Sequence, residues 1–209
     1  MLDLSLYLVT DSYDYTNEEF LWYVEEAIKG GVTLVQLREK FKSGREIYDL
    51  ARATCELCHR YNVPFLVDDR VDIALAVGAD GVHVGQTDLP AAEVRKLIGP
   101  DKILGVTAKN LEHALQAERD GADYVGTGAI FPTTTKVVTV RTPLATLEEI
   151  NQNIGIKQVA IGGINPLNMH ELYGSGADGI AVVSAIMKDA DPQGVAREMR
   201  TQWTIGTQQ

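Results

Sequence analysis

The chain has 209 residues, of which 45% are hydrophobic and 23% charged, and its formal net charge is −10. This length suits one large domain, and we expect residues 1–209 to form it. The acidic balance argues against a nucleic-acid binder, because such proteins meet phosphates with basic faces. No run reaches the roughly 18 apolar residues of a membrane span, and the first residues lack the basic stretch of a signal peptide. We therefore predict a cytoplasmic protein that binds neither nucleic acid nor membrane.

Short runs rich in β-branched residues alternate with longer segments of helical period along the chain. The runs predicted as strands are residues 5–9, 33–37, 64–67, 81–84, 103–106, 124–126, 158–161 and 179–183. The helical period is clearest at residues 17–29, 44–61, 111–119 and 144–151. This alternation predicts parallel β-α units. Eight units, each with a helix-like connection, favour a closed (β/α)8 TIM barrel over a doubly wound open sheet.

Local signals mark several boundaries of these elements. Asn17 can cap the first helix, with Asp14 and Thr16 as rival caps. Pro90 and Pro166 suit the first turn of a helix. The string Gly-Ala-Asp recurs at 78–80, 121–123 and 176–178, each time just before a strand. We expect its glycine to end a helix and its aspartate to open the turn into the strand.

Two cysteines, Cys55 and Cys58, precede His59 in the spacing of a haem-attachment motif. They lie inside a helical segment, and no second cysteine pair is present to complete a zinc site. We therefore expect two reduced thiols on a helix.

Polar residues follow most of the predicted strands, and the carboxyl ends of barrel strands are where active sites form. Gln36, Arg38 and Lys40 alternate after the second strand, so in an extended chain they point to one side. Arginine binds phosphate in a bidentate manner and lysine as a point charge. The pattern indicates a cationic wall for a phosphorylated ligand, with an ordinary charged loop as the alternative.

A second group of polar residues is acidic. Asp68 and Asp69 follow the third strand and Asp88 follows the fourth. Carboxylates at adjacent strand ends suit Mg²⁺, which is commonly held by one or two carboxylates together with a substrate phosphate. Asp88 precedes Leu89 and Pro90, so a helix cap is a rival interpretation of this residue.

A third group forms a candidate phosphate cradle. Residues 162–166 follow the seventh strand with two glycines, and residues 183–186 follow the eighth. Loops in these two places form the usual phosphate site of the barrel, and glycine lets backbone N–H groups approach the ligand. Together the three groups indicate two phosphorylated small molecules, or one with two phosphate ends. His83, within the fourth strand, is expected to be buried and hydrogen-bonded rather than catalytic.

Several strings of residues, in this order and spacing, resemble the thiamine-phosphate synthase (thiamine-phosphate pyrophosphorylase) family over nearly the whole chain. They are YLVTD at 7–11, QLREK at 36–40, DRVDIA at 69–74, GVHVGQ at 81–86, GTGAIFPT at 126–133 and AIGGI at 160–164. The resemblance implies a Mg²⁺-dependent transferase of thiamine biosynthesis. It would join hydroxymethylpyrimidine diphosphate to a thiazole ethyl phosphate, and the family also suggests a homodimer.

Carried over residue by residue, the resemblance implies three sets of site residues. Those for the pyrimidine diphosphate are Gln36, Leu37, Arg38, Glu39, Lys40, Asp68, Thr107 and Lys136. Those for the thiazole phosphate are Thr133, Thr134, Thr135, Gly163, Val183 and Ser184, and those for Mg²⁺ are Asp69 and Asp88. The catalytic contacts would come from Arg38, Lys40, Thr107 and Lys136.

The chain departs from the family pattern at two of these positions. Residue 68 is Asp where the family most often has Asn, and a second carboxylate there would repel diphosphate unless metal intervenes. Residue 107 is Thr where Ser is common, which keeps the hydroxyl. The alternative functions are a related thiazole tautomerase and a non-catalytic sensor of phosphorylated ligands. The presence of Gln36, Arg38, Lys40, Asp69, Asp88 and Lys136 argues against the tautomerase, and the complete set of cations and metal ligands argues against the sensor.

Overall fold

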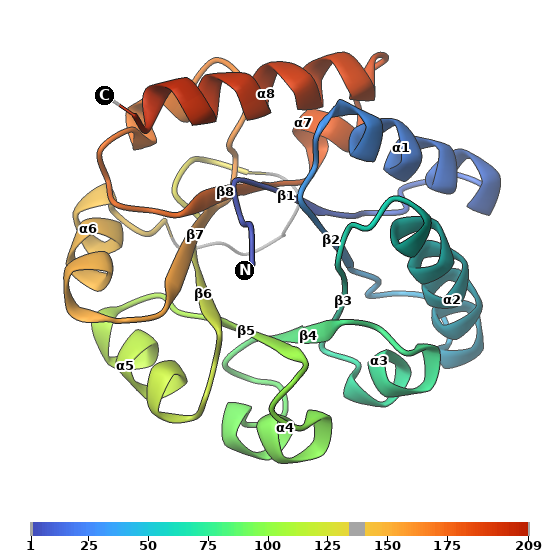
Figure 1. Cartoon of the computed structure of the whole chain (residues 1–209), viewed down its shortest axis with the longest axis horizontal. Coiled ribbons are helices and arrows are strands. Elements are labelled where there is room, and N and C mark those ends of the chain that lie inside the picture. The colour runs from blue at the N-terminus through green and yellow to red at the C-terminus, as the bar shows by residue number, and fades with distance from the viewer. Residues whose placement is uncertain (1, 134–140, 209) are drawn as a thin grey trace.

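A computed structural model describes residues 2–133 and 141–208. Within these ranges, parallel strands close into a barrel in the order β1 to β8, with β1 paired to both β2 and β8 (Figure 1). The strands are β1 Leu6–Val9, β2 Leu34–Leu37, β3 Phe65–Asp68, β4 Gly81–Val84, β5 Ile103–Thr107, β6 Tyr124–Gly128, β7 Lys157–Ile161 and β8 Gly179–Val182. The predicted (β/α)8 barrel is confirmed.

The helices lie outside the ring of strands (Figure 1). They are α1 Asn17–Gly30, α2 Gly44–Arg60, α3 Val71–Val77, α4 Ala91–Ile98, α5 Leu111–Arg119, α6 Leu144–Asn153, α7 Ser184–Met187 and α8 Pro192–Gly206. Between β7 and β8 the described chain has only a short 3₁₀ helix, η1 Met169–Leu172, so Pro166 does not start a helix as expected. Pro90 is the N-cap residue of α4 and lies one position before its first turn.

The cap of α1 is Thr16, and not Asn17 as first proposed. The Thr16 hydroxyl accepts a hydrogen bond from the Glu19 backbone N–H, and the Glu19 carboxylate accepts one from the Thr16 N–H. This reciprocal pair needs a glutamate three residues after the cap, which Thr16 has. Ser43 and Glu46 start α2 in the same way.

Side chains of each strand alternate between two apolar layers. The outer layer packs the strands against the helices. The inner layer fills the barrel and consists of Leu4, Tyr7, Val9, Leu34, Leu66, Tyr124, Val159 and Ala181, joined by Leu2 at the amino-terminal end. The barrel interior is therefore packed, and the polar groups that could bind a ligand gather at the mouth formed by the carboxyl ends of the strands.

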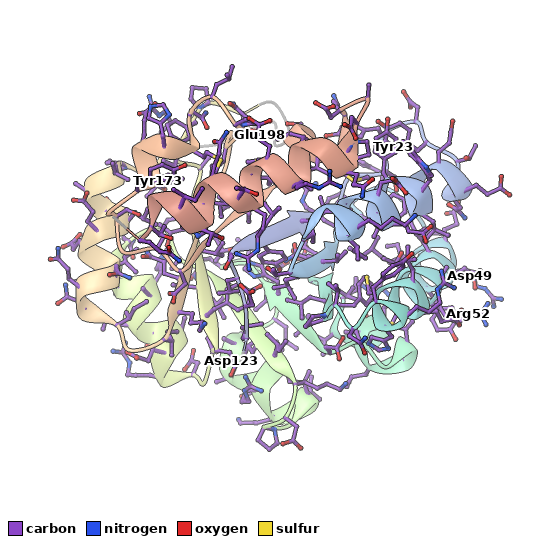
Figure 2. All side chains as sticks on the ribbon, turned by 45° about the horizontal axis from the view of Figure 1, so that its top comes forward. Tyr23, Asp49, Arg52, Asp123, Tyr173 and Glu198 are labelled. Atoms are coloured by element: carbon purple, nitrogen blue, oxygen red, sulfur yellow. The ribbon has the colours of Figure 1, made fainter. Side chains whose placement is uncertain are left out.

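Each of the recurring Gly-Ala-Asp strings forms a hydrogen bond between two neighbouring strands. Each glycine has a left-handed backbone, as a helix end requires. Each aspartate, of which Asp123 is labelled in Figure 2, accepts a hydrogen bond from a backbone N–H of the preceding strand. The bonds are Phe65 N to Asp80 at 2.8 Å, Leu104 N to Asp123 at 2.7 Å and Gln158 N to Asp178 at 2.8 Å. The string thus links β3 to β4, β5 to β6 and β7 to β8.

The last helix, α8, packs beside the first, α1 (Figures 1 and 2). Arg200 of α8 pairs with Asp3 at 3.1 Å, and the ring of Tyr173 packs against Trp203.

Cys55 and Cys58 are free and buried in α2, and burial raises the pKa of the Cys55 thiol to about 11. None of the helices in the described ranges has the length and apolar character of a membrane span.

Candidate active site

The cationic wall lies where β2 ends. Arg38 Nε is 4.0 Å from a carboxylate oxygen of Asp68, and its Nη1 is 3.9 Å from one of Asp11. Lys40 Nζ is 2.7 Å from Asp68 and also donates a hydrogen bond to Asp69. The two cations therefore converge on the ends of β2 and β3. Their side chains are partly exposed, at 20% for Arg38 and 35% for Lys40, and each forms ion pairs with carboxylates beside it.

Leu37 and Glu39 alternate with these cations and point elsewhere. Leu37 is buried in the outer apolar layer. The Glu39 carboxylate accepts a hydrogen bond from the Ser12 hydroxyl and is 3.9 Å from Lys42 Nζ. Neither side chain joins the cationic wall, so any contact of these two residues with a ligand would come from their backbone.

Asp68 is the last residue of β3, and its side chain is only 10% exposed. Burial raises the pKa of its carboxyl group, and the neighbouring Lys40 ammonium opposes that rise. The carboxylate faces Lys40 and Arg38 rather than open solvent. This pairing gives a physical reason why the chain tolerates an acid at this position.

Asp69 and Asp88 bring two carboxylates together at the ends of β3 and β4. Asp69 has a left-handed backbone with φ 58°, and Asp88 accepts a hydrogen bond from Gly85 N at 2.8 Å. Burial raises the pKa of Asp88, and the nearby Asp69 carboxylate raises it further. A divalent cation would relieve this repulsion, so the pair fits Mg²⁺ held by two carboxylates and a substrate phosphate. Among the described residues no cluster of three or more Asp, Glu, His or Cys is arranged to hold a metal.

Below the mouth, a row of polar side chains crosses the barrel interior. Gln36 Nε2 donates to Tyr7 Oη at 2.5 Å, and Tyr7 Oη is 2.8 Å from Tyr124 Oη. His83 Nδ1 is 3.0 Å from Tyr124 Oη, and its Nε2 is 2.9 Å from Thr107 Oγ1. Burial lowers the pKa of His83 to about 4, so the ring is neutral at pH 7. His83 is hydrogen-bonded, as expected from the sequence, and its side chain is half-buried.

The candidate phosphate cradle follows β7 and β8, on the other side of the mouth from Asp68 and Asp69. Gly162 and Gly163 both have left-handed backbones, with φ 103° and 68°. A Cβ on Gly163 would lie 2.3 Å from the carbonyl oxygen of Pro132, so the loop after β6 packs directly on this glycine. That contact brings the chain leading into Thr133 against the cradle. Val183 and Ser184 follow β8, with Val183 capping the short α7.

Three of the residues predicted for the site, Thr134, Thr135 and Lys136, lie outside the described residues. Asp11, Tyr7 and Tyr124 were not singled out from the sequence. Asp11 follows the first strand, and the same strand-end position that marked the other groups could have identified it. The tyrosines lie within strands, where no local pattern separates a polar interior residue from an apolar one.

The chain matches the family model described as "Thiamine monophosphate synthase" over residues 6–186. It is 52% identical over 192 residues to the thiamine-phosphate synthase of Methanobrevibacter smithii, covering 92% of this chain and 91% of that protein. It is 51% identical over 198 residues to the thiamine-phosphate synthase of Clostridium tetani, covering 95% of each chain.

Solved structures show the same likeness. The thiamine phosphate pyrophosphorylase of Pyrococcus furiosus is 40% identical and superposes with a TM-score of 0.86, covering 98% of each chain. The 3-hexulose-6-phosphate synthase of Salmonella typhimurium, at 20% identity and a TM-score of 0.75, covers 97% of this chain and 100% of its own, and shares the fold alone.

Proposed function

Since this chain belongs to the thiamine monophosphate synthase family, we propose that it condenses hydroxymethylpyrimidine diphosphate with thiazole ethyl phosphate to form thiamine phosphate and diphosphate. The observation that carries the proposal is the division of the mouth into two parts. Cations and carboxylates lie at the ends of β2, β3 and β4, and a glycine-lined cradle follows β7 and β8. Two phosphorylated ligands can thus be held face to face.

In this proposal the leaving diphosphate lies against Arg38, Lys40 and Lys136. Arg38 and Lys40 are held at the ends of β2 and β3 by Asp68, so they are in position to stabilise negative charge as it develops on the departing oxygen. Asp69 and Asp88 would hold Mg²⁺, which when bound neutralises diphosphate charge.

The remaining residues align the two rings. Gln36 and Thr107 lie at the floor of the mouth, on β2 and β5, and would orient the pyrimidine. Thr133, Gly163, Val183 and Ser184, together with Thr134 and Thr135, would fix the thiazole phosphate. No general base is required, because the thiazole nitrogen attacks the exocyclic carbon with its own lone pair after the carbon–oxygen bond to diphosphate breaks. Alignment of the two reactants then contributes much of the rate.

The proposal is tested with purified protein, both substrates and Mg²⁺, by following diphosphate release and the formation of thiamine phosphate. Controls omit thiazole phosphate or add EDTA. We expect release only when both substrates and the metal are present. Binding of thiazole phosphate without turnover would overturn the proposal in favour of a tautomerase or a sensor.

We further propose, on the family resemblance, that residues 1–209 form a single catalytic domain in a cytoplasmic homodimer. Sedimentation velocity measures the association state, and a monomer at micromolar concentration would contradict the dimer.

A further inference from the structure

The polar row inside the barrel joins two residues that the proposed function assigns to the pyrimidine substrate. It runs from Gln36 on β2 through Tyr7 on β1, Tyr124 on β6 and His83 on β4 to Thr107 on β5. Tyr7 and Tyr124 are each 1% exposed or less, so water does not substitute for these bonds. The row therefore connects the two sides of the mouth through the protein interior.

Strand register makes this connection possible. Gly105 of β5 is paired with His83 on one side and with Tyr124 on the other. A Cβ on Gly105 would lie 2.3 Å from Tyr124 Oη and 2.5 Å from His83 Nδ1. The two side chains thus meet across a strand that has no side chain of its own at that point.

With the Gln36 amide nitrogen against Tyr7, one order of donors and acceptors uses every proton of the row in a hydrogen bond. Gln36 Nε2 can only donate, so the Tyr7 hydroxyl proton is used within the row when it is donated to Tyr124. The Tyr124 proton then goes to His83 Nδ1. In this order the single N–H of the neutral imidazole is on Nε2 and points at Thr107 Oγ1. The Thr107 proton is then directed away from His83.

We propose that Tyr7, Tyr124 and His83 are positioning residues that impose this single direction of hydrogen bonding on Gln36 and Thr107. Gln36 is left with its carbonyl oxygen as an acceptor, and Thr107 with its hydroxyl proton as a donor for the ligand. Which atoms of the pyrimidine substrate can bind is thereby set from within the barrel. This role rests on the proposed function, but the direction of the row is a property of the ligand-free protein.

The first test measures the direction of hydrogen bonding in the row, through the tautomer of His83, and needs no enzymatic turnover. ¹⁵N NMR of the imidazole rings at pH 7, with the His83 signals assigned by their loss in His83→Gln, distinguishes the two neutral tautomers. We expect an N–H at Nε2 and a bare Nδ1. A His83 ring with its proton on Nδ1 would reverse the whole row and overturn the proposal, whatever the enzymatic activity.

The second test removes one hydroxyl from the row. In Tyr124→Phe we expect His83 to lose its single tautomer in the NMR spectrum and kcat/KM for the pyrimidine diphosphate to fall about tenfold or more. The KM for thiazole phosphate should stay unchanged. Tyr61→Phe is the matched control, because it removes an exposed hydroxyl that donates to Glu25 at 2.5 Å, outside the barrel. Equal kinetics in the two variants would show that the row is only structural.

Discussion

His83 should make the stability of the protein depend on pH in a way that can be calculated. Its pKa in the folded protein is about 4, against about 6.5 in an unfolded chain, because burial disfavours the charged ring. Between these two pH values, the His83 ring is therefore protonated in the unfolded chain and neutral in the folded protein. The stability contributed by the neutral ring is fully present above pH 6.5 and is lost as the pH falls toward 4.

The two pKa values give a magnitude for this loss. From the two pKa values, proton linkage predicts that the contribution of His83 lowers the unfolding free energy of the wild type by roughly 2 kcal/mol when the pH falls from 7 to 5. Glutamine at this position cannot take up the proton in either state. His83→Gln is therefore expected to be less stable than wild type at pH 7, because it disturbs the polar row, but to lose roughly 2 kcal/mol less on acidification to pH 5.

Urea unfolding of both proteins at pH 7 and pH 5, in EDTA, measures the difference. The carboxylates are the same in both proteins and contribute equally to the pH dependence of each. The change with pH in the difference between the two unfolding free energies therefore reports on His83 alone. A gap that stays constant between the two pH values, within about 0.5 kcal/mol, would show that the ring is readily protonated in the folded protein. The reasoning from burial would then be wrong.

Three further changes test the surroundings of the mouth. Lys40→Met leaves Asp68 and Asp69 without their shared cation, and urea unfolding in EDTA should show a loss of roughly 1–2 kcal/mol, given that Lys40 is partly exposed; equal stability would contradict the pairing. Gly105→Ala places a methyl group 2.3 Å from Tyr124 Oη, and the overpacking should cost roughly 1–3 kcal/mol by thermal unfolding; an unchanged Tm would show that the ring can move aside. Asp68→Asn should keep activity in the diphosphate-release assay, because an amide can still face Lys40, and a loss of about 100-fold or more, ~2.7 kcal/mol of transition-state stabilisation, would contradict this.

Most of the fold was predictable because a TIM barrel repeats a local pattern. β-branched runs at regular spacing mark the strands, and β4 begins and ends at the predicted residues. The prediction fell short at β6, which continues to Gly128 rather than stopping at Gly126. Glycine is a poor strand former, so local propensity ends the strand early. In the structure the space beside Gly126 is taken by the His83 ring, a long-range contact that local propensity does not contain.

The candidate site likewise contains residues that could be predicted from local sequence and residues that could not. Residues that follow a strand, such as Arg38, Asp69 and Gly163, could be found from their position, because all parallel strands end at the same edge. The contact between Tyr7 and Tyr124 could not, since these residues are 117 positions apart and meet only through the register of several strands. The sequence marks Asp68 as unusual, but its pairing with Lys40 arises only from the folded arrangement of β2 and β3.

The closed ring has a consequence for how the chain is divided. Cations and carboxylates come from β2, β3 and β4, in the first half of the sequence, whereas the glycine cradle comes from β7 and β8, in the second. The halves are joined at two seams, which are the strand pairs β4–β5 and β8–β1. The polar row crosses between the halves three times, from Tyr7 to Tyr124, from Tyr124 to His83 and from His83 to Thr107. The first half therefore supplies the cations and carboxylates of the mouth, the second half supplies the glycine cradle and Thr107 of β5, and the seams determine how these groups face each other. Substitutions at a seam would therefore change how the polar groups of the two halves face each other across the mouth.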